Sequence, residues 1–305
     1  MSTITVDISA GIATICLNRP DSLNSLTVED YDAFAKALRD IDKRDDVVVT
    51  VWQGTGKWFC AGTDVKTAGA AQDSVIGNVR EAFLKAVTLS TTDCGQAVGY
   101  FLTGQCLIVK FFSLIALQPP QDSGCGPQWP GDGYDSLPSF MLNFRTITLA
   151  GIAAAFLGYF DFIYSLPNAW LSVPFTFIGI IAEGGSSVSF INRMGLAKAN
   201  EALIWGKKKD AQELLQCGFI NKIFPQQSVE SFHKAVRALV LDDMEGLDPS
   251  AIFEVKRLLK KGLDEKNSMD AVNLRESIAQ AERFASGIPA RQFIRIANKE
   301  IRHKL

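Results

Sequence analysis

Histidine is almost missing from this chain of 305 residues, with only His233 and His303 present. So few histidines disfavour a histidine-rich metal site and a Ser-His-Asp triad. The six cysteines are scattered and form no CxxC pair, which disfavours a zinc site and a disulfide framework. We therefore expect reduced thiols in an intracellular protein.

An excess of charge of either sign is also missing. The 31 Lys and Arg residues nearly balance the 33 Asp and Glu residues, for a net charge of −2. A nucleic-acid partner normally requires a concentrated basic face, so we predict none. The first residues show no basic-then-apolar signal pattern. A content of 47% hydrophobic and 21% charged residues is typical of a globular protein.

Apolar patterning predicts a mixed α/β first part. Alternating residues over 4–8 and 12–17 predict a β-hairpin. Thr27, followed by acidic residues, predicts a helix start. The run 47–52 is short and apolar enough for a strand that is buried on both faces. The apolar face of the predicted helix consists of Tyr31, Phe34, Leu38 and Ile41.

The C-terminal third has helical periodicity over 229–241, 249–263 and 268–284. We therefore expect a helical region that follows the α/β part. In the last of these helices the apolar side chains that share one face are Ala271, Leu274, Ile278 and Ala281.

Two small-residue turns and one glutamate suggest a reaction site. Cys60–Asp64 and Gly151–Ala154 each follow an expected strand, and small residues let backbone N–H groups approach a ligand oxygen. Two such groups aimed at one point form an oxyanion hole. Glu183 is a lone carboxylate in apolar surroundings. Together these groups suit proton abstraction beside a thioester carbonyl, although Glu183 could instead cap a helix that begins near Gly185.

Residues 98–150 have no clear period and contain many Pro and Gly breakers. A structureless stretch of this length is unusual in a compact domain. The run 99–117 is largely apolar and carries one charge, Lys110, besides Gln105, so a membrane-associating segment is an open alternative.

Taken together, several motifs resemble the crotonase (enoyl-CoA hydratase/isomerase) superfamily, and most closely its peroxisomal Δ3,Δ2-enoyl-CoA isomerases. The motifs are Leu17–Pro20 with Leu23–Leu26, Phe59–Asp64, Gly151–Ala153 with Asp161–Tyr164, Gly179–Gly185, and Lys198–Leu203. The resemblance implies an α/β fold, a spiral of ββα units over 1–225. A C-terminal helical region over 226–305 would close the CoA site and build a homotrimer or homohexamer.

The resemblance also implies a reaction. The thioester oxygen of an acyl-CoA would be held by the N–H groups of Ala61 and Ile152. The two glutamates of hydratases correspond here to Ala155 and Phe175, which disfavours hydration. Glu183 matches the single glutamate of the isomerases, which shifts a 3-enoyl-CoA double bond to the 2-position in fatty-acid β-oxidation without a metal or redox cofactor. The residues that would border CoA are Ser22, Leu23, Ser25, Gly62, Asp64 and Gly151.

Other readings stay open within and beyond this family. The chain could have another crotonase activity, such as enoyl-CoA hydratase or acyl-CoA hydrolase, or be a non-catalytic subunit of the same fold. The ending His303-Lys304-Leu305 is a variant of the Ser-Lys-Leu address that the peroxisomal import receptor reads. We therefore expect a peroxisomal protein.

The chain departs from the family before its second turn. The family has a strand with Ala-Leu-Asn-Gly-Pro there, whereas Thr146–Ala150 precedes Gly151. Synonymous codons for Asp122–Gly133, shifted by one base, can encode that missing strand. We therefore interpret residues 98–150 as including translated intron and out-of-frame exon; a genuine insertion is the alternative. If this segment does include them, we expect the central strand to be absent and Ile152 to lose its support.

Overall fold

The computed structural model describes residues 3–56, 58–62, 64, 139–143, 149–150 and 152–302. Its main sheet has six strands in the order β1-β2-β3-β4-β6-β9. The first pair is antiparallel, and all other neighbours in this sheet are parallel. The strands are β1 (Ile4–Ser9), β2 (Ile12–Leu17), β3 (Val49–Gly54), β4 (Ser139–Asn143), β6 (Phe162–Ser165) and β9 (Lys222–Ile223).

A smaller sheet has the order β5-β7-β8. Its strands are β5 (Leu149–Ala150), β7 (Trp170–Ser172) and β8 (Lys209–Asp210). The α-helices are α1 (Val28–Asp42), α6 (Ile152–Ala155), α7 (Ser186–Leu203), α8 (Ala211–Gln216), α9 (Val229–Met244), α10 (Pro249–Asp264), α11 (Met269–Ala285) and α12 (Ile288–Ala297). Two short 3-10 helices, η1 (Pro20–Ser22) and η2 (Phe156–Tyr159), complete the described part.

The predictions for the first part of the chain are confirmed. The hairpin forms as β1 and β2, and the Thr27 side chain caps α1 in a reciprocal capping box with Asp30. The predicted apolar face of α1 is buried: Tyr31, Phe34, Leu38 and Ile41 are each 2–5% exposed. β3 is buried along most of its length, as its apolar run predicts.

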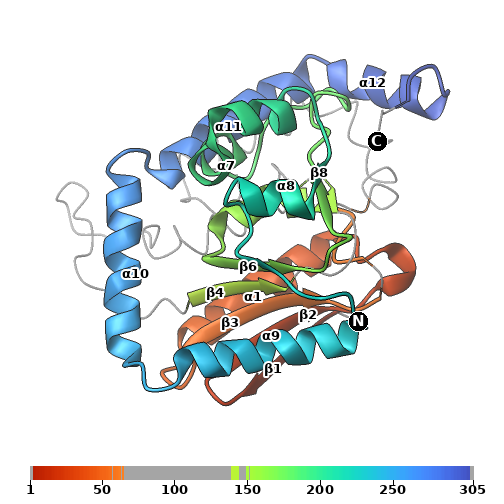
Figure 1. The fold of residues 1–305 in the computed structure, drawn as a ribbon. Coiled ribbons are helices and arrows are strands. Elements are labelled where there is room, and N and C mark those ends of the chain that lie inside the picture. The colour runs from red at the N-terminus through yellow and green to blue at the C-terminus, as the bar shows by residue number, and fades with distance from the viewer. Residues whose placement is uncertain are drawn as a thin grey trace.

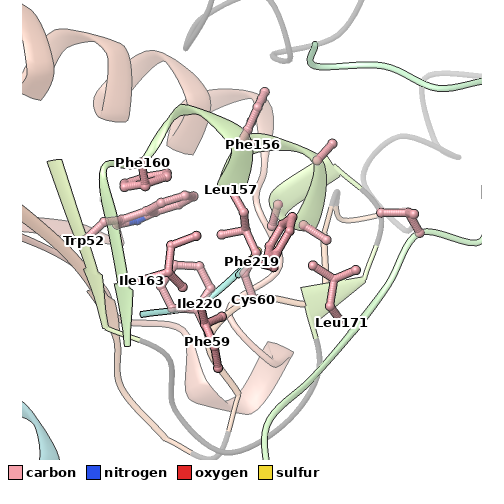
Figure 2. Packing of buried hydrophobic residues seen from close by; sticks show 14 of the residues in the cluster. Trp52, Phe59, Cys60, Phe156, Leu157, Phe160, Ile163, Leu171, Phe219 and Ile220 are labelled. Carbon is pink, nitrogen blue, oxygen red and sulfur yellow. The ribbon is translucent and has the colours of Figure 1, made fainter. Parts of the chain in front are cut away.

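The main sheet carries apolar side chains on both faces. On one face, α9 packs Phe232, Val236 and Val240 against Val49 and Val51 (Figure 1). The other face builds a larger cluster (Figure 2). There Trp52 stacks on Phe160, with ring centroids 5.6 Å apart and planes 17° apart. Burial of large apolar side chains on both faces is the main favourable term that holds the sheet in place.

The C-terminal helices occur where the sequence predicts them, but of the predicted apolar face of α11 only Ala281 is buried, at 7% exposure. Leu274 and Ile278 are 59% and 51% exposed. The helix instead buries Asn273, Glu276 and Gln280, which are at most 8% exposed. α11 therefore packs with a polar stripe toward the body of the protein, beside α7 (Figure 1).

The expectation that the central strand is absent is also wrong. β4 lies between β3 and β6 and is parallel to both. β5 then pairs with β7, so the backbone that leads into Ile152 is held in a sheet. The remaining residues of 98–150 lie outside the described residues, and the origin of that segment stays a prediction.

The membrane alternative was raised by the run 99–117, which also lies outside the described residues. In the part of the chain that the structure describes, no helix is long and apolar enough to cross a membrane.

Candidate active site

Glu183 lies in the loop between β7 and α7 and is only 5% exposed. Two glycines turn the chain from this glutamate into α7: Gly184 has φ 63° and Gly185 has φ 74°. Residues with a side chain rarely adopt such angles, so this tight exit depends on glycine. A Cβ at Gly185 would also come within 2.5 Å of the Tyr159 hydroxyl. The sequence Glu-Gly-Gly therefore determines the backbone path between Glu183 and the start of α7.

Glu183 is buried, but its surroundings are not wholly apolar as we expected. The side-chain Nε2 of Gln280, on α11, donates to Glu183 Oε2 at 2.7 Å. The other end of the same amide, Oε1, accepts from the Ile181 N–H at 3.2 Å. Gln280 thus joins the carboxylate to the backbone of its own loop. A buried carboxylate needs such donors because its charge loses the hydrogen bonds of water.

A second buried carboxylate, Glu276, stands one turn earlier on α11. It accepts hydrogen bonds from the N–H groups of Gly185 at 2.7 Å and Ser187 at 3.0 Å. Burial raises the pKa of Glu276, against the lowering effect of these hydrogen bonds. The Glu276 carboxylate thus holds the start of α7 through two backbone N–H groups. Sequence periodicity gave no signal for Glu276 or Gln280, because both lie on a face with few apolar residues.

The turn Cys60–Asp64 is bonded to the loop that follows β2. Ala61 N–H donates to the Leu23 carbonyl at 3.0 Å, Leu26 N–H to the Gly62 carbonyl at 2.8 Å, and Asp64 N–H to the Leu26 carbonyl at 2.9 Å. The Ala61 N–H therefore already has an acceptor within the protein. Its hydrogen bond to the Leu23 carbonyl would have to break before it could hold a thioester oxygen. Its role in the oxyanion hole stays a prediction.

The Arg19 side chain forms hydrogen bonds with three of the residues expected near CoA. Its guanidinium donates to Ser22 Oγ at 3.3 Å, to the Ser25 carbonyl at 3.0 Å and to Asp64 Oδ2 at 3.0 Å. Leu23 is 38% exposed in the same loop. Of the six residues expected to border CoA, five thus come together: Ser22, Leu23, Ser25, Gly62 and Asp64. The sixth, Gly151, lies outside the described residues.

Ile152 is the first residue of α6, a helix of four residues. The first N–H groups of a helix have no acceptor inside it, which leaves them available to a ligand. β5 and β7 are parallel neighbours, so Ile152 and the Glu183 loop leave the small sheet in the same direction. Cys60, Ala153 and Ile180 share one buried cluster, which links all three segments.

Comparison with known proteins identifies the family. Two family models described as enoyl-CoA hydratase/isomerase match residues 12–90 and 150–289. A Δ(3,5)-Δ(2,4)-dienoyl-CoA isomerase of Pyricularia oryzae is 31% identical, over 99% of this chain and 98% of that protein. The chain belongs to the crotonase (enoyl-CoA hydratase/isomerase) superfamily.

One further relative agrees with this crotonase assignment, and one solved structure shows the fold. A 3,2-trans-enoyl-CoA isomerase of Saccharomyces cerevisiae is 26% identical, over 95% of this chain and 92% of that protein. The crystal structure of an enoyl-CoA hydratase/isomerase from Pseudoalteromonas atlantica aligns with a TM-score of 0.71 at 20% identity, covering 100% of both chains. The predicted crotonase-type α/β fold with a C-terminal helical region is therefore confirmed.

The two positions that the resemblance assigns to the hydratase glutamates are apolar in this crotonase. Ala155 and Phe175 are both fully buried at 0% exposure. Neither side chain can donate or accept a proton. Among the described positions at which the resemblance predicts a catalytic carboxylate, Glu183 has one, and its role as the base stays a prediction.

Proposed function

We propose that this protein is a Δ3,Δ2-enoyl-CoA isomerase of fatty-acid β-oxidation that uses Glu183 as its only acid–base group. The substrate is a 3-enoyl-CoA thioester and the product is the 2-enoyl-CoA. The observation that supports this best is the state of Glu183: a buried carboxylate with a fixed amide donor, in a family whose hydratase positions here are apolar.

The proposed reaction moves one proton. Glu183 takes a proton from C2, and the C–H electron pair enters a dienolate in which the thioester oxygen gains charge. As the dienolate collapses, this pair forms the C2–C3 double bond, and the former C3–C4 π electrons bond the proton that the same carboxyl group delivers to C4. No electrons are gained or lost, so the reaction needs no redox partner. Burial of Glu183 favours return of the same proton, because water has little access to it.

The oxyanion hole in this proposal consists of the Ala61 and Ile152 N–H groups. Charge develops on the thioester oxygen only as C2 loses its proton, and amides fixed at that point stabilise the dienolate. For Ala61 this requires the hydrogen bond to Leu23 to open when acyl-CoA binds. The CoA moiety would lie along Ser22, Leu23, Ser25, Gly62, Asp64 and Gly151.

A second candidate is Δ3,5,Δ2,4-dienoyl-CoA isomerisation, favoured by the 31% identity to the Pyricularia oryzae protein over 99% of this chain. That reaction carries the proton from C2 to C6, two carbons further along the chain. A second acid–base group near the far carbon would assist it. The buried Phe175 offers none, and this favours the shorter transfer.

The test compares Glu183→Gln with Glu282→Gln, which removes an exposed carboxylate from α11. Wild type and both variants are assayed with 3-enoyl-CoA and 3,5-dienoyl-CoA. We expect Glu183→Gln to lower kcat for 3-enoyl-CoA by about a hundredfold to ten-thousandfold, since a positioned acid–base group contributes that much. Glu282→Gln should retain wild-type turnover.

Near-normal turnover of Glu183→Gln would refute Glu183 as the base. Faster turnover of the dienoyl substrate than of 3-enoyl-CoA by the wild type would favour the second candidate.

A further inference from the structure

α11 faces the Glu183 loop with a row of buried polar side chains. Asn273, Glu276 and Gln280 are spaced so that they share one face of the helix, and each is at most 8% exposed. The apolar Leu274 and Ile278 of the same helix are more than half exposed. Burying polar groups costs free energy unless each finds a partner, so this arrangement is held by specific hydrogen bonds.

Most of these partners belong to the loop that carries Glu183 and to the start of α7. Gln280 bonds Ile181 and Glu183, and Glu276 bonds Gly185 and Ser187. One turn further along α11, Arg283 Nε donates to the Gly179 carbonyl at 2.7 Å. A single helix thus holds this loop at successive points.

Because Gln280 is the α11 residue that bonds the carboxylate itself, we propose that it is a positioning residue for Glu183. This inference rests on the proposed function. Its amide fixes Glu183 Oε2 while its carbonyl fixes the backbone at Ile181, so the carboxyl plane is tied to its own loop. A neutral amide cannot take up the transferred proton. A base that collects a proton at one carbon and delivers it at another depends on this orientation.

α12 provides a matched control for a purely structural role. The Gln292 side chain donates through Nε2 to the Phe177 carbonyl at 3.0 Å. Gln292 thus donates from the same kind of side-chain amide to the same loop, but its acceptor is a backbone carbonyl six residues before the proposed base. Gln280→Met and Gln292→Met each remove one such donor with little change in side-chain size. Only Gln280→Met removes a hydrogen bond to the Glu183 carboxylate.

The experiment measures kcat, KM and melting temperature for wild type and both variants with 3-enoyl-CoA. We expect Gln280→Met to lower kcat about tenfold to a hundredfold, as a base misplaced by about 1 Å does. Its KM should stay within about threefold of wild type, because CoA contacts are untouched. Gln292→Met should keep wild-type kcat. If Gln280→Met fails to fold, Gln280→Asn keeps an amide that is one carbon too short to bond both Ile181 and Glu183, and it should show the same loss of kcat.

Unchanged kcat in Gln280→Met, or an equal fall of kcat in Gln292→Met, would overturn the positioning role alone. A wild type that does not isomerise 3-enoyl-CoA would overturn the proposed function, and this inference with it.

Discussion

Gly185 shows how much one residue can depend on its surroundings. It adopts φ 74° at the start of α7, and a Cβ there would meet the Tyr159 hydroxyl and the Met269 methyl group, both at 2.5 Å. Gly246, between α9 and α10, has the same φ of 74° but no atom within 4 Å of a Cβ. Substitutions at these two glycines therefore distinguish the cost of the left-handed backbone from the cost of crowding around an added Cβ.

We expect Gly246→Ala to lower the free energy of unfolding by about 1–2 kcal/mol, the cost of a left-handed conformation for a residue with a side chain. Gly185→Ala should lower it further, because Tyr159 must also move. Urea unfolding of both variants measures the difference. Equal losses would show that the contacts around Gly185 yield without cost.

Among the helices, α10 and α11 expose large apolar side chains that the rest of the described chain does not cover. These are Val255, Leu258, Leu259, Leu263, Leu274 and Ile278, each 51–65% exposed. Apolar area of this kind gains free energy when a partner removes it from water. The family resemblance implies a homotrimer or homohexamer, and these two helices are candidates for its contacts.

We therefore expect light scattering to give the mass of three or six chains for the wild type. Leu259→Lys and Ile278→Lys should lower that mass, because each places a charge in the proposed contact. Leu241→Lys, on α9, changes a side chain that is 40% exposed and should leave the mass unchanged. A wild type with the mass of one chain would contradict the expectation.

At the scale of the whole molecule, the peroxisomal location expected from the sequence depends on three residues outside the described part, His303, Lys304 and Leu305. We expect a fluorescent protein fused to the N-terminus to enter peroxisomes. Deletion of Leu305 should leave it in the cytosol, because the import receptor reads the final residues. Lys304→Arg, which keeps the charge, is the control. Peroxisomal fluorescence without Leu305 would rule out this tail as the address.

The sequence predicted the parts of the fold whose cause is local. The cap at Thr27 and the apolar face of α1 follow from side chains a few residues apart. Glu183 was predicted as the base from a short motif with apolar neighbours; the structure confirms that it is buried, and its role stays a prediction. β4 was missed because its place in the sheet depends on strands far along the chain.

The buried face of α11 was predicted wrongly for a related reason. Apolar periodicity selected Leu274 and Ile278, whereas hydrogen bonds to a distant loop decide which face is buried. A polar side chain such as Gln280 gives no sign in the sequence that its partner is Glu183. Predicting such a pair requires the tertiary contact itself.

The bond between Glu183 and Gln280 joins residues 97 positions apart in the sequence. Ribosomes add about 5–20 residues per second, so the proposed base is synthesised several seconds before the side chain proposed to orient it. Until α11 has been made, the carboxylate has no amide from Gln280 to hold it. The order of synthesis therefore keeps the reactive group without its orienting partner until translation is nearly complete.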